Sequence, residues 1–152
     1  MKTEAKPLEK TYAQCVAEGF IKPKDKVDIP LITSLLTLAE EGILRLRKLS
    51  DIWEKESKNY AFLLREHYEI LRMLIDACLY FDKISISNHQ CSNAYLCMKH
   101  PDLEFDWEIL ETMRILRNAV NYEGKRIDSE QWSKLKLQFE VYTNTLRRMV
   151  ED

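Results

Sequence analysis

Residues 60–82 read YAFLLREHYEILRMLIDACLYFD, and the spacing of their large side chains predicts one long helix. Steps of four and three residues alternate along this stretch, which is the spacing of a helix face that packs against another helix. The positions on that face are Tyr60, Leu64, His67, Leu71, Leu74, Cys78 and Phe81. Such a helix needs partners, so we expect it to end near Asp82 and to pack within a bundle.

Four more helical stretches lie around this one in the sequence. The first runs from Pro30 to about Ser50 and carries an apolar stripe, formed by Ile32, Leu36, Ala39, Ile43 and Leu46 with Leu35 and Leu49 beside it. A short helix follows a predicted Ser87–Gln90 capping box and ends at His100-Pro101. The remaining two run from about 107 to 122 and from about 129 to 149, and the last has its own packing face, Trp132, Leu135, Phe139, Tyr142, Leu146 and Met149.

The ends of these helices carry recognisable capping residues. Asp106 is a suitable N-cap, Gly124 is a suitable stop, and Asp128 opens the last helix. Long helices joined by short connections predict an all-α fold, an up-and-down bundle of four to five helices. We expect two parts: an N-terminal arm of residues 1–28, with a short helix from Leu8 to Glu18, and a single bundle domain of residues 29–152.

Composition fits a globular helical domain and gives little information about partners. The chain has 152 residues, 45% of them hydrophobic, and its 23 basic and 25 acidic residues give a net charge of −2. This balance gives no global argument for binding nucleic acid or a membrane. The sequence begins Met1-Lys2-Thr3-Glu4 without an apolar signal segment, so we expect a cytoplasmic protein with reduced cysteines and no membrane association.

The polar end of the helix near residues 107–122 is the most informative segment. At about 100° per residue, one arc of this helix collects Glu111, Arg114, Arg117, Asn118, Asn121 and Tyr122. One interpretation is an ordinary solvated face. The other is a phosphate-binding surface, because a guanidinium group forms paired hydrogen bonds to phosphate oxygens.

Residues 116–125, LRNAVNYEGK, resemble the signature of HEPN domains, in which an Arg, often followed by Asn, precedes a His or its substitute by four intervening residues. The segment CVAEGFI at 15–21, followed by a basic link and by LAEE at 38–41, is similar to the N-terminal part of many archaeal HEPN proteins. Residues 87–91, SNHQC, are similar to their middle part. The resemblance covers roughly residues 12–150.

The resemblance implies a homodimer in which the motif-bearing helices of two subunits form a composite cleft. In active HEPN ribonucleases this cleft works without metal: the Arg supports the phosphate, and the His assists proton transfer at the RNA 2′-hydroxyl. Carried over to this chain, the catalytic set is Arg117, Asn118 and Tyr122, and Arg114 and Asn121 are additional ligand-binding residues. The family also implies a nucleotidyltransferase-like partner of the kind found in toxin–antitoxin pairs.

Tyr122 departs from the motif because it stands at the His position. A tyrosine with a pKa of about 10 is a poor general base near neutrality, whereas a histidine near 6.5 is well suited to proton transfer. The first hypothesis is therefore a diverged HEPN-like module that binds RNA, a nucleotide or a protein partner. The second is an active metal-independent endoribonuclease, and the third is a non-catalytic interaction scaffold whose arginine face holds two subunits together.

Other candidate residues are assigned structural roles. His67 lies on a packing face and is expected to be buried and hydrogen-bonded. The nominal metal ligands His89, Cys91, Cys97 and His100 bracket an apolar helix instead of forming a compact knuckle, so we expect no metal and no cofactor, with both cysteines packed as small apolar residues.

Overall fold

A computed structural model describes residues 6–56 and 58–151, most of which are helical. The elements in chain order are α1 (Leu8–Ala17), β1 (Ile21–Pro23), α2 (Ile29–Glu56), α3 (Ala61–Phe81), β2 (Ile84–Ile86), α4 (His89–Lys99), the 3-10 turn η1 (Pro101–Leu103), α5 (Trp107–Glu123) and α6 (Ser129–Glu151). The predicted helical bundle is confirmed at this level. Residues 1–5 of the predicted arm and residue 152 of the predicted bundle domain lie outside the described residues.

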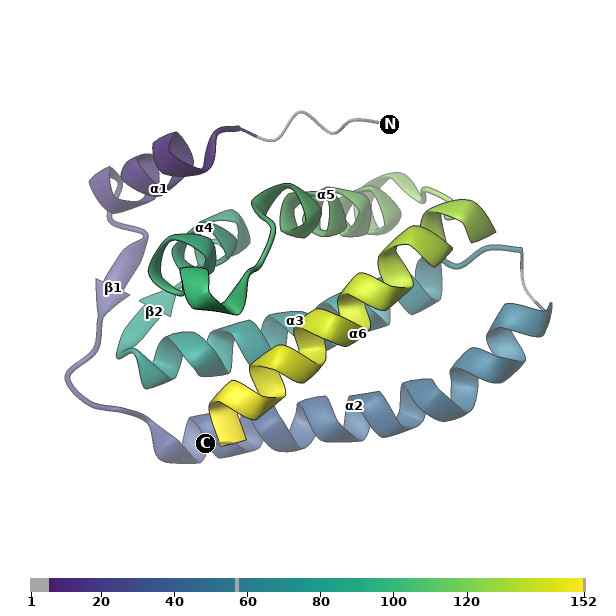
Figure 1. The fold of residues 1–152 in the computed structure, drawn as a ribbon, viewed down its shortest axis with the longest axis horizontal. Helices are drawn as coiled ribbons and strands as arrows, with labels where there is room; N and C mark the ends of the chain where they lie inside the picture. Colours follow the sequence, from purple (N-terminus) through teal and green to yellow (C-terminus); the bar gives the residue numbers. More distant parts are fainter. Residues whose placement is uncertain (1–5, 57, 152) are drawn as a thin grey trace.

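Helix α3 is the centre of the bundle. It packs against α2, α4, α5 and α6, and Figure 1 shows α6 crossing it obliquely. The four long helices α2, α3, α5 and α6 alternate in direction along the chain (Figure 1). The predicted packing face is confirmed at its centre, where Leu64, Leu71, Leu74 and Cys78 are fully buried. Phe81 is exposed instead, because the helix ends there and leaves it without a neighbouring turn to cover it.

Most helix boundaries follow the capping residues. The Asp106 side chain accepts hydrogen bonds from the backbone N–H groups of Glu108 and Ile109, and Gly124 ends α5 in the left-handed region with φ +64°. Two boundary predictions are wrong. Helix α2 continues past Ser50 to Glu56, because no glycine or proline lies between these two residues and Trp53 still packs on Phe62.

The predicted capping box at α4 is also wrong in its members. Asn88, not Ser87, is the N-cap, and its side-chain oxygen accepts from the backbone N–H of Cys91 at 3.1 Å. Gln90 does not reach back to the cap, because its side chain binds Glu111 on α5. A hydrogen bond from Gln90 to α5 therefore replaces the expected hydrogen bond within the capping box.

A two-stranded antiparallel sheet was not predicted. β1 pairs with β2 so that Ile21 lies opposite Ile86, and the Lys24 N–H donates to the carbonyl of Lys83 at 2.7 Å just beyond the sheet. Each strand has only three residues, which is too short to produce a visible alternation of apolar and polar positions. The sheet ties the segment after α1 to the loop after α3.

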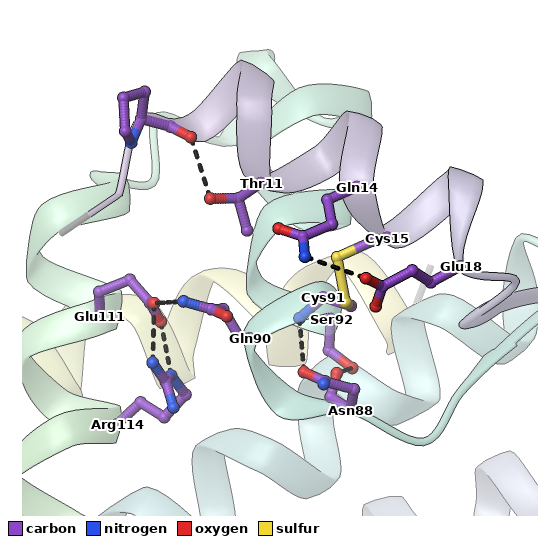
Figure 2. Close-up of a disulfide and its surroundings, with 11 residues drawn as sticks. Thr11, Gln14, Cys15, Glu18, Asn88, Gln90, Cys91, Ser92, Glu111 and Arg114 are labelled. Carbon is purple, nitrogen blue, oxygen red and sulfur yellow. Dashed lines mark hydrogen bonds and ion pairs between the residues drawn. A yellow bond between two sulfur atoms is a disulfide. The ribbon is translucent and has the colours of Figure 1, made fainter.

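The N-terminal arm packs on the bundle. Helix α1 lies against α4, and a disulfide joins Cys15 of α1 to Cys91 of α4 (Figure 2). The indole N–H of Trp107 donates to the carbonyl of Lys6 at 2.7 Å, which holds the residue before α1 against the start of α5. The expectation of reduced cysteines is therefore wrong for Cys15 and Cys91, and Cys91 is not a simple apolar packing residue.

Candidate functional site

The polar face of α5 divides into a buried part and an accessible part. Glu111, which the helical arc placed on the solvated side, is 1% exposed because α4 covers that end of the helix. Arg117 is partly covered, with 15% of its side chain exposed, and Asn118 is also half-buried. Asn121 is exposed and Tyr122 is 80% exposed. The predicted solvated arc is therefore wrong at its N-terminal end.

The buried part is a hydrogen-bonded network around the Glu111 carboxylate. Arg114 binds it with two N–H groups, Nε to Oε2 at 2.8 Å and Nη2 to Oε1 at 3.0 Å. From α4, Gln90 donates to Oε1 at 2.8 Å (Figure 2). Asn93, also on α4, donates to Oε2 at 3.5 Å. A buried carboxylate needs such partners, so this network holds α4 to α5. Two N–H groups of Arg114, a predicted ligand-binding residue, are engaged in it.

The accessible part is built around Arg117. Its Nη2 donates to Glu69 Oε1 of α3 at 2.6 Å, and its Nη1 donates to Asn118 Oδ1 at 3.3 Å. The guanidinium carbon lies 5.7 Å from the centroid of the Tyr68 ring, within the range of a cation–π contact. The Nε atom is buried and has no hydrogen-bond partner among the described residues. A buried N–H without an acceptor is uncommon, so this guanidinium is incompletely satisfied.

His89, which the sequence analysis considered as a nominal metal ligand, approaches the Tyr68 ring from α4. Its ring centroid is 6.5 Å from that of Tyr68, so His89 and Arg117 both lie near the same aromatic ring. Burial, together with the positive charges of Arg72 and Arg117, lowers the pKa of His89 to about 4. The imidazole is therefore neutral at pH 7, and one of its ring nitrogens can accept a hydrogen bond.

Two further ionisable groups line a small hollow next to His89. Burial raises the pKa of Asp76 to about 6, with Arg72 partly opposing the shift, and burial raises the pKa of Tyr68 to about 12. The hollow is lined by Tyr68, Arg72, Ile75, Asp76, His89, Ser92 and Asn93. Because α3 supplies one wall and α4 the other, only the tertiary fold brings these residues to Arg117.

The predicted motif residues do not converge on one point. Arg117 and Asn118 are hydrogen-bonded to each other, whereas Tyr122 lies more than one helical turn further along α5 and projects into solvent. No hydrogen bond within the described residues joins Tyr122 to either of them. The ionisable groups near Arg117 include the Glu69 carboxylate, which binds it directly, and the His89 imidazole, whereas Tyr122 is not among them.

A larger cavity lies elsewhere, between α2, α3 and α6. Its volume is about 360 Å³, and His67, Ile70 and Phe139 are among its lining residues. The α2–α6 ion pairs Glu40–Arg147 and Glu54–Lys136 connect the two helices. The Nδ1 of His67 lies 2.8 Å from the carbonyl of Leu63, as the predicted hydrogen bond requires, but the residue is half-buried and not fully buried. None of the α5 motif residues lines this cavity.

Comparisons of the chain with protein-family models, with curated proteins and with solved structures found no match. Among the described residues, no helix combines the length and apolar character that crossing a membrane requires. The geometry of the site itself therefore carries the functional argument. An arginine with an unsatisfied N–H, neighbouring amides and an exposed aromatic side chain form a surface suited to an oxyanion attached to a planar base.

Proposed function

We propose that this chain is a HEPN-like homodimeric module that binds single-stranded RNA through the accessible part of the α5 polar face. Arg117 is the phosphate ligand, Asn118 and Asn121 are polar contacts, and Tyr122 stacks on a base. The observation that carries the proposal is the Arg117 Nε, a buried N–H without an acceptor on a guanidinium at the position of the motif arginine. A phosphate oxygen supplies the missing acceptor once the guanidinium turns away from Glu69.

Glu69 acts as an internal competitor in this proposal. Its carboxylate is 2.6 Å from Arg117 Nη2 and is 35% exposed, so it is accessible enough to be displaced by an incoming phosphate. Replacing it with a neutral amide removes the competing charge and leaves the shape of the side chain nearly unchanged. This geometry therefore predicts that Arg117 is required for RNA binding and that Glu69 weakens it.

The test is fluorescence anisotropy with a labelled single-stranded oligoribonucleotide, measured in chelator over a series of salt concentrations. We expect binding that weakens as salt rises, because phosphate contacts release counterions. Arg117→Ala should reduce affinity and flatten the salt dependence by about one unit of slope, whereas Glu69→Gln should increase affinity. The matched control is Arg148→Ala, an exposed arginine on α6. Equal effects of Arg117→Ala and Arg148→Ala, or no salt-sensitive binding, would contradict the proposal.

The homodimer belongs to the same proposal. Tyr122 is 80% exposed in one subunit, and the family arrangement covers this helix end with the equivalent helix of a second copy. Light scattering at micromolar concentration should give twice the mass of 18.1 kDa. A monomer would remove the composite cleft and leave RNA binding to the single-subunit surface.

His89 favours a second candidate function, a metal-independent endoribonuclease. The neutral imidazole and the Arg117 guanidinium share the Tyr68 ring, so a proton acceptor and a phosphate ligand lie within one small region. Incubation of RNA with the protein in chelator tests this candidate. Cleavage that is lost in both Arg117→Ala and His89→Gln but kept in Tyr122→Phe would assign the base to His89, and loss in Tyr122→Phe would return it to the motif position.

Partner and location complete the proposal. By resemblance, the protein works beside a nucleotidyltransferase-like partner. We place it in the cytoplasm, where a persistent disulfide such as Cys15–Cys91 is an exception. Trapping thiols directly on cell lysis tests whether this pair is oxidised in the cell. Co-purification with the product of a neighbouring reading frame tests the partner. If neither RNA binding nor cleavage is found but such a complex is, the scaffold hypothesis replaces the RNA-binding one.

A further inference from the structure

The end of α3 and the end of α4 bring together three side chains with different donor atoms. Cys78 lies on the last turn of α3, Asp82 is the residue directly after α3, and His100 is the residue directly after α4. One thiol sulfur, one carboxylate oxygen and one imidazole nitrogen from these residues all lie within 4.8 Å of one another. The three positions are separated in sequence, so the packing of α4 on α3 assembles them.

The contacts inside this group hold the side chains in defined orientations. His100 Nε2 lies 2.6 Å from Asp82 Oδ2, and the Tyr95 hydroxyl donates to the same oxygen at 3.1 Å. The Cys78 sulfur lies 3.5 Å from the thioether sulfur of Met149 on α6. Cys78 is fully buried, whereas Asp82 and His100 are only half-buried, so the group is reached from its carboxylate and imidazole side.

The surroundings favour a cation over an anion. Besides Asp82, the carboxylate of Asp102 lies close enough to act on Cys78 electrostatically. The carbonyl groups at the C-terminal end of α3 add partial negative charge at the same place. Cys78 is also one of two cysteines that stay free while Cys15 and Cys91 form a disulfide. The thiol is thus retained next to a carboxylate and an imidazole in a negatively charged environment.

The structure assigns a Zn²⁺ site to this group, with Cys78 Sγ, Asp82 carboxylate oxygen and His100 Nε2 as ligands. Mixed sulfur, nitrogen and oxygen donors are a ligand set that Zn²⁺ accepts, and three protein ligands leave a fourth position for water. Tyr95 donates a hydrogen bond to the Asp82 carboxylate and so holds this ligand in position, as hydrogen-bonding groups around zinc ligands do. Binding releases the proton of the Cys78 thiol, and His100 must carry its ring proton on Nδ1 so that the Nε2 lone pair is free for the metal ion.

This site differs from the ligand set that the sequence suggested. Of His89, Cys91, Cys97 and His100, the disulfide consumes Cys91, and His89 faces the Arg117 side of α4. Cys97 and His100 remain, but the Cys97 sulfur lies 3.8 Å from the carbonyl of Phe105, whereas the possible co-ligands of His100 come from the end of α3. The inference is independent of the proposed RNA binding, because none of the three ligands belongs to the α5 surface.

The test uses the full chain with its disulfide intact, stripped with chelator, freed of the chelator and kept without reductant under nitrogen. Competition with a chromophoric zinc chelator should give one Zn²⁺ per chain. Substitution with Co²⁺ should produce a thiolate-to-cobalt charge-transfer band, because sulfur is a ligand. Zn²⁺ should also raise the thermal unfolding temperature, since a metal that binds only the folded state stabilises it.

Variants separate metal binding from an ordinary hydrogen-bonded cluster. Tyr95→Phe should weaken Zn²⁺ affinity by about 10- to 100-fold, as outer-shell substitutions do, and Cys78→Ala and His100→Gln should weaken it more. Cys97→Ala, the other free cysteine, is the matched control and should bind like the natural chain. Circular dichroism checks that each variant folds. If Cys78→Ala does not fold, His100→Gln still tests the site, because it changes a half-buried residue. Absence of the charge-transfer band, or equal zinc affinity in His100→Gln and Cys97→Ala, would overturn the assignment.

Discussion

The two arginines of the α5 polar face have similar sequence surroundings and different structural roles. Arg114 pairs with Glu111, which is 1% exposed and receives further hydrogen bonds from Gln90 and Asn93 of α4. Arg117 pairs with Glu69, which is 35% exposed, and keeps one N–H without an acceptor. The difference lies in the burial of the two partner carboxylates and not in the arginines themselves.

This comparison separates stability from binding along one helix. An ion pair whose carboxylate is fully buried is very costly to break, because removing the arginine strands that charge without water. The Arg117 side chain is only 15% exposed, but its partner carboxylate is exposed enough to stay hydrated, so this pair contributes less to stability and its arginine can turn to a ligand. We therefore expect substitutions in the Glu111 network to act on folding and substitutions around Arg117 to act on binding.

The largest effect is expected from Arg114→Ala. It leaves the Glu111 carboxylate buried with only neutral donors from α4, and the free energy of unfolding should fall by about 3–5 kcal/mol. Urea denaturation of the variant and the natural chain measures the difference. A loss below about 1 kcal/mol, the range of exposed pairs, would place Arg114 in the same class as Arg117 and end the distinction.

The disulfide supports the same buried half, because Cys91 lies on α4 next to Gln90. Replacing both Cys15 and Cys91 with Ser should lower the free energy of unfolding by about 2–4 kcal/mol, chiefly by releasing a constraint on the unfolded chain. Adding reductant to the natural chain should have a similar effect. The double variant serves as the control, since its stability should not respond to reductant.

Two groups near Arg117, His89 and Asp76, are expected to change the stability of the fold in opposite directions as pH falls. His89 has a folded pKa of about 4 against 6.5 in the free side chain, so the unfolded chain binds its proton first and stability falls as pH drops from 6.5 to 4. Asp76 has a folded pKa of about 6 against 3.8, so the folded chain binds its proton first and stability rises as pH drops from 6 to 4.

The two dependences largely cancel in the natural chain, and single variants should expose them. Between pH 6.5 and 4, Asp76→Asn should lose stability as pH falls, whereas His89→Gln should gain it. Thermal unfolding at pH 7.0, 6.0, 5.0 and 4.5 provides the measurement. Identical pH profiles for the two variants would show that neither group is perturbed by its burial.

The smallest effect on folding is expected from Arg117→Ala. Its partner Glu69 remains hydrated after the substitution, so the free energy of unfolding should change by no more than about 1 kcal/mol. The same variant should lose most of the RNA affinity in the anisotropy measurement. A stability loss as large as that of Arg114→Ala would mean that Arg117 is held for structural reasons.

Sequence alone predicted the helices better than the site. The spacing of Leu64, Leu71 and Leu74 is that of a packed helix face. The ends of α5 are marked by Asp106 and Gly124. Both features depend on residues that are close together in the sequence. The role of Glu111 depends on α4, which lies about 20 residues earlier in the sequence, and the helical arc of α5 contains no information about it.

The residues around Arg117 were missed for a related reason. Glu69 and Tyr68 belong to α3, and His89 belongs to α4, so they reach Arg117 only when three helices pack. The adjacent polar residues Ser87 and Asn88 both suit an N-cap, and local chemistry did not distinguish them. The sheet of β1 and β2 and the Cys15–Cys91 pairing join segments more than 60 residues apart, beyond the reach of local patterns.

The Cys15–Cys91 bond also determines how the molecule responds to a pulling force. Its two cysteines are 76 positions apart, so α2 and α3 lie entirely within a covalent ring. Tension applied to the chain ends passes from α1 directly to α4, and the ring cannot lengthen. Full mechanical extension of the oxidised chain should therefore fall short of that of the reduced chain by roughly 250 Å, while the central helix of the bundle carries none of the load.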